Sequence, residues 1–299
     1  MDIRVLRYYI AAVENGTISG AAEALGLTQP TLSRQLMDLE KELGCRLLER
    51  SNRKLRLTEK GEVFLERART IVRLSERTVE EMRASSELTG EIRIAAGETQ
   101  GMRLLALAMR RLREEAPGVR FQLTSGAYDT VRSQLDAGIT DFGLFVGAVD
   151  LRRYASIKLP TRDRFGLITT RTGPLGGRAE LRPEDFEGLP LIMSHQSAQN
   201  REFLGWLGTS ADKVRLIGTF NLLYNACIMA EAGIGHVMAI EGVIWPSAFE
   251  GLCWIPLAPQ LEADLHLAWN SERRLSAAAL RFLEIFREES ARPSNDKLN

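Results

Sequence analysis

The sequence contains few cysteines and histidines, and those that it has are scattered. Its three cysteines (Cys45, Cys227 and Cys253) form no C-x-x-C pair, which argues against both a disulfide framework and a zinc site. The three histidines are equally far apart along the chain, so the sequence indicates no histidine-based metal cluster either. We therefore expect neither a metal nor a cofactor.

Net charge and long apolar runs are absent as well. The 39 Lys and Arg residues balance 39 Asp and Glu, so any contact with nucleic acid must come from a local basic patch. No run approaches the ~18 apolar residues that span a bilayer. The N-terminal segment MDIRVLRYYI also lacks the apolar stretch of a signal peptide. We expect a cytoplasmic protein that makes no membrane contact.

The common catalytic signatures are missing too. The sequence contains no G-x-S-x-G elbow, no H-E-x-x-H motif and no P-loop, and its acidic and basic residues form no recognisable catalytic pattern. This argues against an enzyme. The length of 299 residues is compatible with about two domains at roughly 150 residues each.

The first sixty residues predict three short helices and a tight turn. Apolar residues at helical spacing mark the first helix: Leu6, Tyr9, Ile10 and Val13. Gly16 ends this helix, and Ser19 can cap an alanine-rich second helix that stops at Gly26. Thr28 can cap the third helix. Two helices joined by so short a turn form a helix-turn-helix.

The third helix has an apolar stripe opposite a polar face. The predicted stripe consists of Leu32, Leu36, Leu39 and Leu43. The N-terminal part of the opposite face carries Gln29, Thr31, Ser33 and Arg34. Gln can bond adenine bidentately, Arg can bond guanine, and Thr and Ser can reach base or phosphate. An ordinary solvated face is the alternative, but the adjoining tight turn favours DNA recognition.

A basic segment follows the third helix. Between residues 46 and 60 it holds six basic residues: Arg46, Arg50, Arg53, Lys54, Arg56 and Lys60. Only two acids accompany them, so the segment supplies the local positive patch that a neutral protein needs. Its pattern predicts a β-hairpin wing with Leu55 and Leu57 facing inwards. Such a wing can lay Arg53 or Lys54 along the phosphate backbone or into the minor groove.

A long helix is predicted from residue 59 to residue 89. Its heptad seam consists of Leu65, Ala68, Val72, Ser75, Val79 and Met82. One interpretation is a helix packed into a core. The other is a dimerisation helix, because a long helix between two domains needs a partner to cover its apolar seam.

From residue 90 the pattern changes to alternating strands and helices. GEIRIAA, VRFQL and DFGLFV are strand segments separated by helical ones, which predicts βαβ units and a mainly parallel sheet. A second series of this kind follows, so we expect two lobes with a ligand cleft between them. We place lobe I at about 90–161 and 268–299, and lobe II at about 162–267.

The segment AAEALGLTQPTLSRQLMDLEKELGCRLLER, followed by SNRKLRLTEKG, resembles the winged helix-turn-helix of LysR-type transcriptional regulators. The domain order is similar along essentially the whole chain. The resemblance implies an all-α winged helix-turn-helix domain at 1–58, a dimerising linker helix at 59–89, and an α/β effector-binding domain at 90–299. That last domain would have the two-lobed fold of type 2 periplasmic binding proteins.

The same resemblance implies an assembly and a DNA target. It implies homodimers that pair into a homotetramer and bind interrupted inverted repeats in promoter DNA. The implied DNA contacts are Gln29, Pro30, Thr31, Ser33 and Arg34, with Arg50 and Arg53 in the wing. RNA polymerase is the expected partner in regulation.

The effector cleft is expected where predicted strands lead into helices. Helix N-termini there favour anionic groups, and the family's effectors are small metabolites, often anionic. The resemblance points to Thr99, Gln100, Ser194 and Phe220 as ligand contacts. Ser125 and His195 lie at similar junctions, and His195 could hydrogen-bond an acid. For each of these residues an ordinary helix cap is the alternative.

Together these features predict a sequence-specific DNA-binding regulator that is controlled by a small molecule. The alternative is a cytoplasmic small-molecule-binding protein or enzyme built on the α/β region, with a vestigial DNA-binding unit. Steeply salt-dependent affinity for duplex DNA would distinguish the first interpretation from the second.

Overall fold

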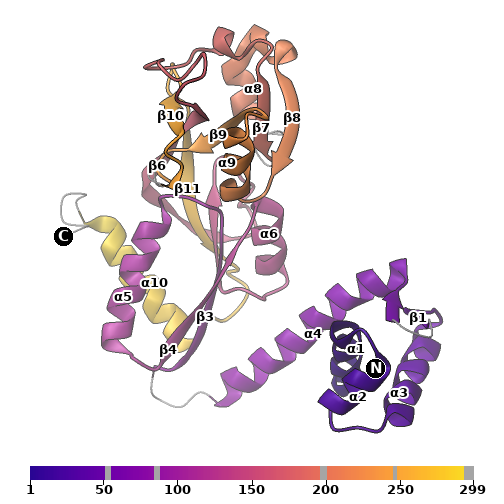
Figure 1. Cartoon of the computed structure of the whole chain (residues 1–299). Coiled ribbons are helices and arrows are strands. Elements are labelled where there is room, and N and C mark those ends of the chain that lie inside the picture. The colour runs from indigo at the N-terminus through magenta and orange to yellow at the C-terminus, as the bar shows by residue number, and fades with distance from the viewer. Residues whose placement is uncertain (51–54, 84–87, 196–200, 245–247, 293–299) are drawn as a thin grey trace. The chain divides into compact units, whose positions relative to one another are not determined.

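The computed structural model describes residues 1–50, 55–83, 88–195, 201–244 and 248–292. Within these ranges it leaves out the side chains of Arg50, Arg77, Glu80, Glu81, Met82, Arg83 and Arg201. The chain divides into two compact units, Met1–Ala84 and Ser85–Asn299 (Figure 1). None of the described helices is long and apolar enough to cross a membrane.

Three helices form the helix-turn-helix of the N-terminal unit: α1 (Ile3–Asn15), α2 (Ile18–Ala24) and α3 (Gln29–Leu43). The Asp2 side chain caps the start of α1. Gly16 ends that helix at a φ of 67°, a left-handed conformation that favours glycine and that confirms the predicted stop.

The caps of the next two helices differ in part from expectation. Thr17, rather than the predicted Ser19, caps α2, because its extended backbone lets its hydroxyl accept the Gly20 amide hydrogen. Thr28 occupies the N-cap position of α3 as predicted. Its hydroxyl lies 2.8 Å from the Thr31 hydroxyl and makes no capping bond to the backbone.

The apolar stripe of α3 packs into the core of this unit. Leu32, Leu36 and Leu39 are buried as predicted, and each contributes roughly 1.5–3 kcal/mol to folding. Leu43 does not fit this prediction: as the last residue of the helix it lies outside the core cluster and is 37% exposed. Tyr9 is fully buried and donates a 2.9 Å hydrogen bond to the Gly61 carbonyl.

The predicted wing is present as a two-stranded antiparallel hairpin. Its strands are β1 (Leu48–Arg50) and β2 (Leu55–Leu57), with Leu48 opposite Leu57. The Glu40 carboxylate in α3 accepts hydrogen bonds from the amides of Leu47 (2.7 Å) and Leu48 (3.0 Å). These bonds fix the start of the wing against α3.

The long helix α4 (Glu59–Arg83) divides its apolar seam between two environments. Leu65, Ala68 and Val72 are buried in the core of the N-terminal unit, so the first half of the seam follows the core-packed interpretation. In the second half of the seam Val79 is 45% exposed, and Leu74, which lies outside the seam, is 43% exposed. For this second half, dimerisation stays a prediction.

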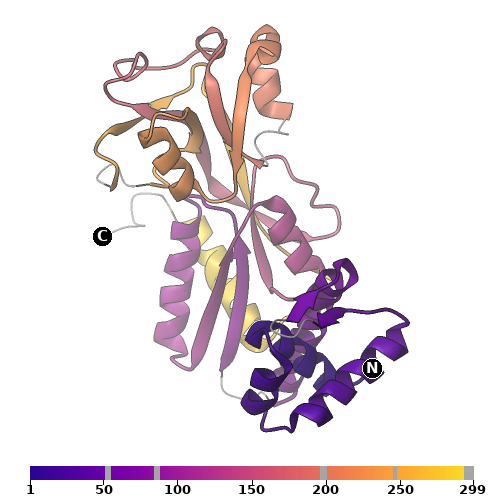
Figure 2. The ribbon, with the colours of Figure 1, turned by 45° about the vertical axis from the view of Figure 1, so that its right-hand side comes forward.

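The first lobe of the C-terminal unit is a sheet covered by helices on both faces (Figure 2). Its central strand β3 (Gly90–Ala96) pairs in parallel with β4 (Val119–Ser125) and β5 (Phe142–Val146). The covering helices are α5 (Met102–Glu115), α6 (Tyr128–Asp136) and α10 (Ala277–Ala291). Helices α5 and α10 pack in one core cluster, and α6 packs in another across the sheet.

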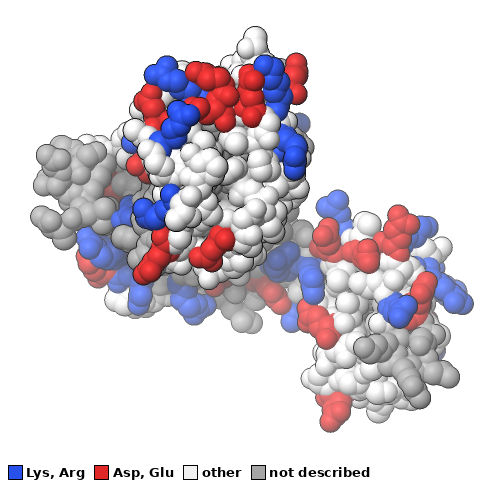
Figure 3. All heavy atoms as spheres, turned by 45° about the horizontal axis from the view of Figure 1, so that its top comes forward, with Lys and Arg blue, Asp and Glu red and all other residues white. Residues whose placement is uncertain are grey.

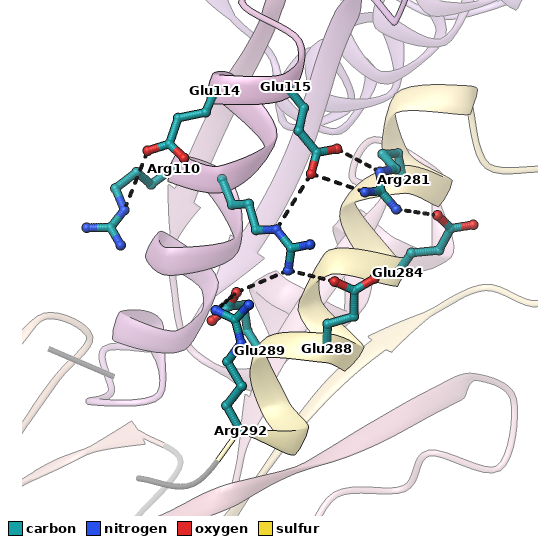
Figure 4. Close-up of polar contacts among 9 residues, drawn as sticks. Arg110, Glu114, Glu115, Arg281, Glu284, Glu288, Glu289 and Arg292 are labelled. Carbon is teal, nitrogen blue, oxygen red and sulfur yellow. Dashed lines mark hydrogen bonds and ion pairs between the residues drawn. The ribbon is translucent and has the colours of Figure 1, made fainter. Parts of the chain in front are cut away.

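Ion pairs also join α5 to α10 (Figure 4). Arg281 contacts Glu115 at 2.8 Å, and Arg111 contacts Glu288 at 2.6 Å and Glu289 at 3.3 Å. The Arg281 guanidinium holds the pKa of Glu115 below its usual range. Because most of these groups are partly exposed, we attribute to them alignment of the two helices more than net stability.

Two strands link the first lobe to the second. The first half of β6 (Ala155–Thr170) pairs with β11 (Glu262–Trp269), and all the pairings of both strands are antiparallel. The prediction of a mainly parallel sheet is therefore wrong here, because a chain that leaves a lobe and returns must reverse direction. Leu265 and Leu267 pack in the first lobe's core, so the return crossing lies before residue 268.

The second lobe repeats the parallel arrangement. Its central strand β7 (Pro190–Ser194) lies parallel to β8 (Arg215–Phe220) and β9 (His236–Ile240). The remaining elements are β10 (Leu252–Pro256), α8 (Arg201–Leu207), α9 (Leu223–Glu231), and the 3₁₀ turns η1 (Pro183–Phe186) and η2 (Gly208–Lys213). Each lobe therefore has an edge at which the carboxyl ends of its parallel strands lie side by side.

Candidate DNA-binding surface and ligand pocket

The solvent-facing side of α3 carries the polar residues that the sequence predicts to read DNA. Gln29, Pro30, Thr31 and Arg34 are exposed, and Ser33 is half-buried. They occupy the first turns of the helix, whereas the opposite side is anchored in the core. The helix therefore presents hydrogen-bonding side chains on a fixed backbone, which is the geometry that major-groove recognition requires.

The wing is described only in part. Arg50 belongs to β1, but its side chain is not described, and Arg53 and Lys54 lie outside the described residues. Arg56 in β2 is exposed and adds a basic side chain to the wing. It belongs to the basic segment recognised in the sequence but was not predicted as a DNA contact. On the face drawn in Figure 3, basic side chains lie among acidic ones and form no single continuous patch.

The C-terminal unit contains a pocket between its two lobes. Its space is about 720 Å³, part of it open to solvent. Residues at or just beyond the carboxyl ends of strands line it, among them Glu98 and Val146 from the first lobe and Ser194 and Phe220 from the second. Ligands of α/β proteins commonly bind at this end of parallel strands.

The predicted ligand residues are placed in different surroundings. Ser194 and Phe220 line the pocket, and Ser125 and His195 are exposed and are not among its lining residues. The Thr99 hydroxyl is buried and accepts a hydrogen bond from the Gly101 amide.

Gln100 joins the two lobes. Its side-chain nitrogen donates to the carbonyl of Gly242 in the second lobe, and its side-chain oxygen accepts from Arg103 at 2.6 Å. The side chain therefore bridges the lobes instead of lining the pocket.

Glu98 makes a second contact between the lobes. It follows β3, and its carboxylate accepts a 2.7 Å hydrogen bond from the amide of Leu223, the first residue of α9. Glu98 was not among the ligand contacts predicted from the sequence. A charged residue directly after a buried strand was the available signal. Burial, with Glu98 nearby, raises the pKa of the Cys227 thiol to about 11, so that thiol stays protonated at neutral pH.

A buried carboxylate lies on the first crossing strand. Asp163 in β6 is 2% exposed, and its oxygens have no hydrogen-bond partner of ordinary geometry among the described residues. Burial raises the pKa of Asp163 to about 6, although the nearby Thr99 hydroxyl and Gln100 amide partly oppose this rise. Within the described ranges, no three His, Cys, Asp or Glu side chains are grouped so that they could hold a metal ion.

Comparison with protein families identifies both parts of the chain. Residues 3–62 match the bacterial regulatory helix-turn-helix proteins of the lysR family. Residues 85–291 match the LysR substrate binding domain. The two matches cover most of the chain, and the boundary between the two compact units falls between them.

Curated relatives and solved structures extend this similarity to full length. The chain is 33% identical to the SDS degradation transcriptional activation protein of Pseudomonas sp. (strain ATCC 19151), over 97% of each protein. It is 39% identical to the HTH-type transcriptional regulator ClcR of Pseudomonas putida, over 82% of this chain and 86% of ClcR. The crystal structure of CbnR, a LysR family transcriptional regulator, has a TM-score of 0.76 at 23% identity, covering 98% of this chain and all of CbnR.

Proposed function

The chain belongs to the LysR family of transcriptional regulators, and on that premise we propose which of its surfaces bind DNA and effector. It is a DNA-binding regulator with a domain for a small-molecule effector. DNA is bound by the exposed side of α3 and by the wing. The residues proposed to contact it are Gln29, Pro30, Thr31, Ser33, Arg34, Arg50, Arg53 and Lys54.

The main support for this proposal is that α3 has one buried face and one exposed polar face. Leu32 and Leu36 are almost fully buried, whereas Thr31 and Arg34 on the same two turns are exposed. An exposed helix whose only role was structural would not need this residue set beside a basic wing. The face has the chemistry to bond guanine and adenine edges while the wing contacts phosphates.

Effector binding is proposed for the pocket between the lobes. Ser194 and Phe220 line the pocket directly. Thr99 and Gln100 act on it indirectly, by holding the segment that carries Glu98. A ligand that binds one lobe arrangement better than another shifts the regulator toward that arrangement.

The assembly follows from the uncovered half of α4. Val79 of the seam is exposed there, and a second copy of the helix would cover the seam in a dimer. Two dimers would form a tetramer that holds two DNA half-sites. Effector binding would change the path of the bound DNA and thereby alter the contact between the regulator and RNA polymerase.

The experiment is the capture of genomic DNA fragments by the purified full-length protein, followed by gel shifts on the recovered fragments. We expect a few sites that share an interrupted inverted repeat. Their affinity should fall steeply as salt increases, because bound phosphates release counterions. If no duplex is enriched at any salt concentration, the DNA-binding proposal is wrong, and the alternative of a ligand-binding protein or enzyme gains support.

A further inference from the structure

The pocket between the lobes contains a negative charge that its other described walls do not balance. Glu98 is the sole ionisable side chain among the described lining residues, and none of them is Lys, Arg or His. A carboxylate has about four acceptor positions, and the Leu223 amide uses one of them. The carboxylate therefore retains the capacity to accept hydrogen bonds from a ligand.

Two helix N-termini at the pocket, those of α9 and α6, have carboxylates of the chain beside them. The amide end of α9 receives the bond to Glu98 through Leu223. Helix α6 also begins at the pocket, where Ala127 lines it, and Asp129 lies in its first turn. Acidic groups at these positions offset the positive end of the helix dipole. An anionic ligand would therefore meet like charge without a compensating cation among the described walls.

The remaining walls are apolar or uncharged. Phe165, Met238 and Val243 offer hydrocarbon surface on the second-lobe side, and Ser194 and Asn221 are neutral hydrogen-bonding groups. Apolar walls with a few placed polar groups are typical of small-molecule sites, where the polar groups decide which head group is accepted.

We propose that this pocket binds a ligand with an apolar body that presents a hydroxyl or ammonium group to Glu98, in preference to a carboxylate. The inference rests on the proposed function, since this ligand would be the effector. The ligand's donor group would compete with the Leu223 amide, or share the carboxylate with it. Binding would therefore act directly on one of the contacts that hold the two lobes together.

The test uses two matched sets of probes with the full-length protein in calorimetric titrations at pH 7.5. One set is hexylamine, hexan-1-ol and hexanoate, and the other is benzylamine, benzyl alcohol and benzoate. In at least one set, we expect the amine or the alcohol to bind at least tenfold more tightly than the carboxylate. The Glu98→Gln variant should lose the preference for the amine and bind the carboxylate better, because the amide keeps the acceptor oxygen but removes the charge.

The matched control is Glu231→Gln, which changes an exposed glutamate at the far end of α9. It should leave the ranking of the probes unchanged. The inference is overturned if a carboxylate binds most tightly in both sets, if Glu98→Gln leaves the ranking unaltered, or if none of the six probes binds. Gel shifts on the captured DNA are run on the same samples. They report failure of the DNA-binding proposal separately. An unchanged tryptophan fluorescence melting curve shows that the C-terminal unit of the variant, which carries Glu98 and all four tryptophans, is folded.

Discussion

The proposed recognition face of α3, which carries Gln29, Thr31, Ser33 and Arg34, and the proposed effector pocket between the lobes are built in different ways. The face comes from one helix, whose exposed residues are set by the helical repeat and by a buried leucine stripe. The pocket comes from loops at the ends of strands that are far apart in the sequence. The first kind of site can be located from local spacing, whereas the second depends on how the strands are ordered in the sheets.

This difference appears in individual residues. Arg34 was selected from its position on a helix, and the structure leaves it exposed. Gln100, at a strand-to-helix junction, was predicted as a ligand contact from the family resemblance, and in the structure its side chain bonds Gly242 in the other lobe. At a junction between lobes, a polar residue can satisfy a ligand or another loop of the same chain, and sequence spacing does not distinguish the two.

The largest effect should come from removing the core beneath the recognition face. Leu36→Ala deletes a buried side chain, which costs about 2–5 kcal/mol and should unfold much of the N-terminal unit. We expect specific DNA binding to be lost while the C-terminal unit stays folded. All four tryptophans lie beyond residue 85, so the tryptophan fluorescence melting curve reports only the C-terminal unit.

Leu280→Ala is the matched control for this prediction. Leu280 lies in α10 and is 48% exposed, so the same substitution should change little there. Loss of the fluorescence transition in Leu36→Ala would mean that the two units do not fold separately. The recognition face of α3 and the pocket would then not be independent sites.

The second prediction concerns Asp163, the buried carboxylate near Thr99 and Gln100. The unfolded pKa of Asp163 is near 3.8 and its folded pKa is about 6, so the folded state holds this proton more tightly. Stability from this group is therefore greatest at low pH and falls as the pH rises from about 4 to 6. Asp163→Asn should raise the unfolding free energy by about 3 kcal/mol at pH 8 and by much less at pH 4.5.

Urea unfolding followed by tryptophan fluorescence at the two pH values measures this effect. Asp212→Asn, at an exposed aspartate in the second lobe, should show no such pH-dependent gain. DNA affinity should be unchanged in the isolated protein, because the substitution lies far from α3 in the sequence and in the other unit. An equal gain at both pH values would show that Asp163 does not carry a buried charge at neutral pH.

Much of the fold was predictable because it depends on local signals. The helix-turn-helix, the wing and the alternation of strands with helices all follow from spacing, caps and turn residues. The long crossing strand β6 was not, since only its second half, RFGLITT, has a clear strand pattern. Glu98 was not selected for the pocket, because its partner Leu223 is 125 residues away and only the lobe arrangement brings the two together.

The third prediction changes the DNA surface without disturbing its support. Arg34→Ala removes an exposed side chain and should weaken binding to a captured site by about 1–3 kcal/mol, roughly 5- to 150-fold. Melting temperature and oligomeric state should stay as in the parent protein. Quantitative gel shifts measure the loss, and Arg110→Ala, an exposed arginine in α5, is the control. Unchanged specific affinity for Arg34→Ala would remove this residue from the recognition face.

The smallest effect on stability is expected from the ion pairs on the surface of the first lobe. Arg281 contacts both Glu115 and Glu284, whereas Arg110 makes a single, longer contact with Glu114 at 4.0 Å (Figure 4). Arg281→Ala should lower the fluorescence melting temperature by at most about 2–4 °C, and the loss should shrink in high salt. Arg110→Ala should cause less change than this. Because hydrocarbon packing between α5 and α10 holds the lobe, a larger and salt-independent loss would mean that the ion pairs set its shape. The shape of the pocket would then depend on ion pairs that lie away from it, whereas the recognition face of α3 depends on the leucines buried beneath it.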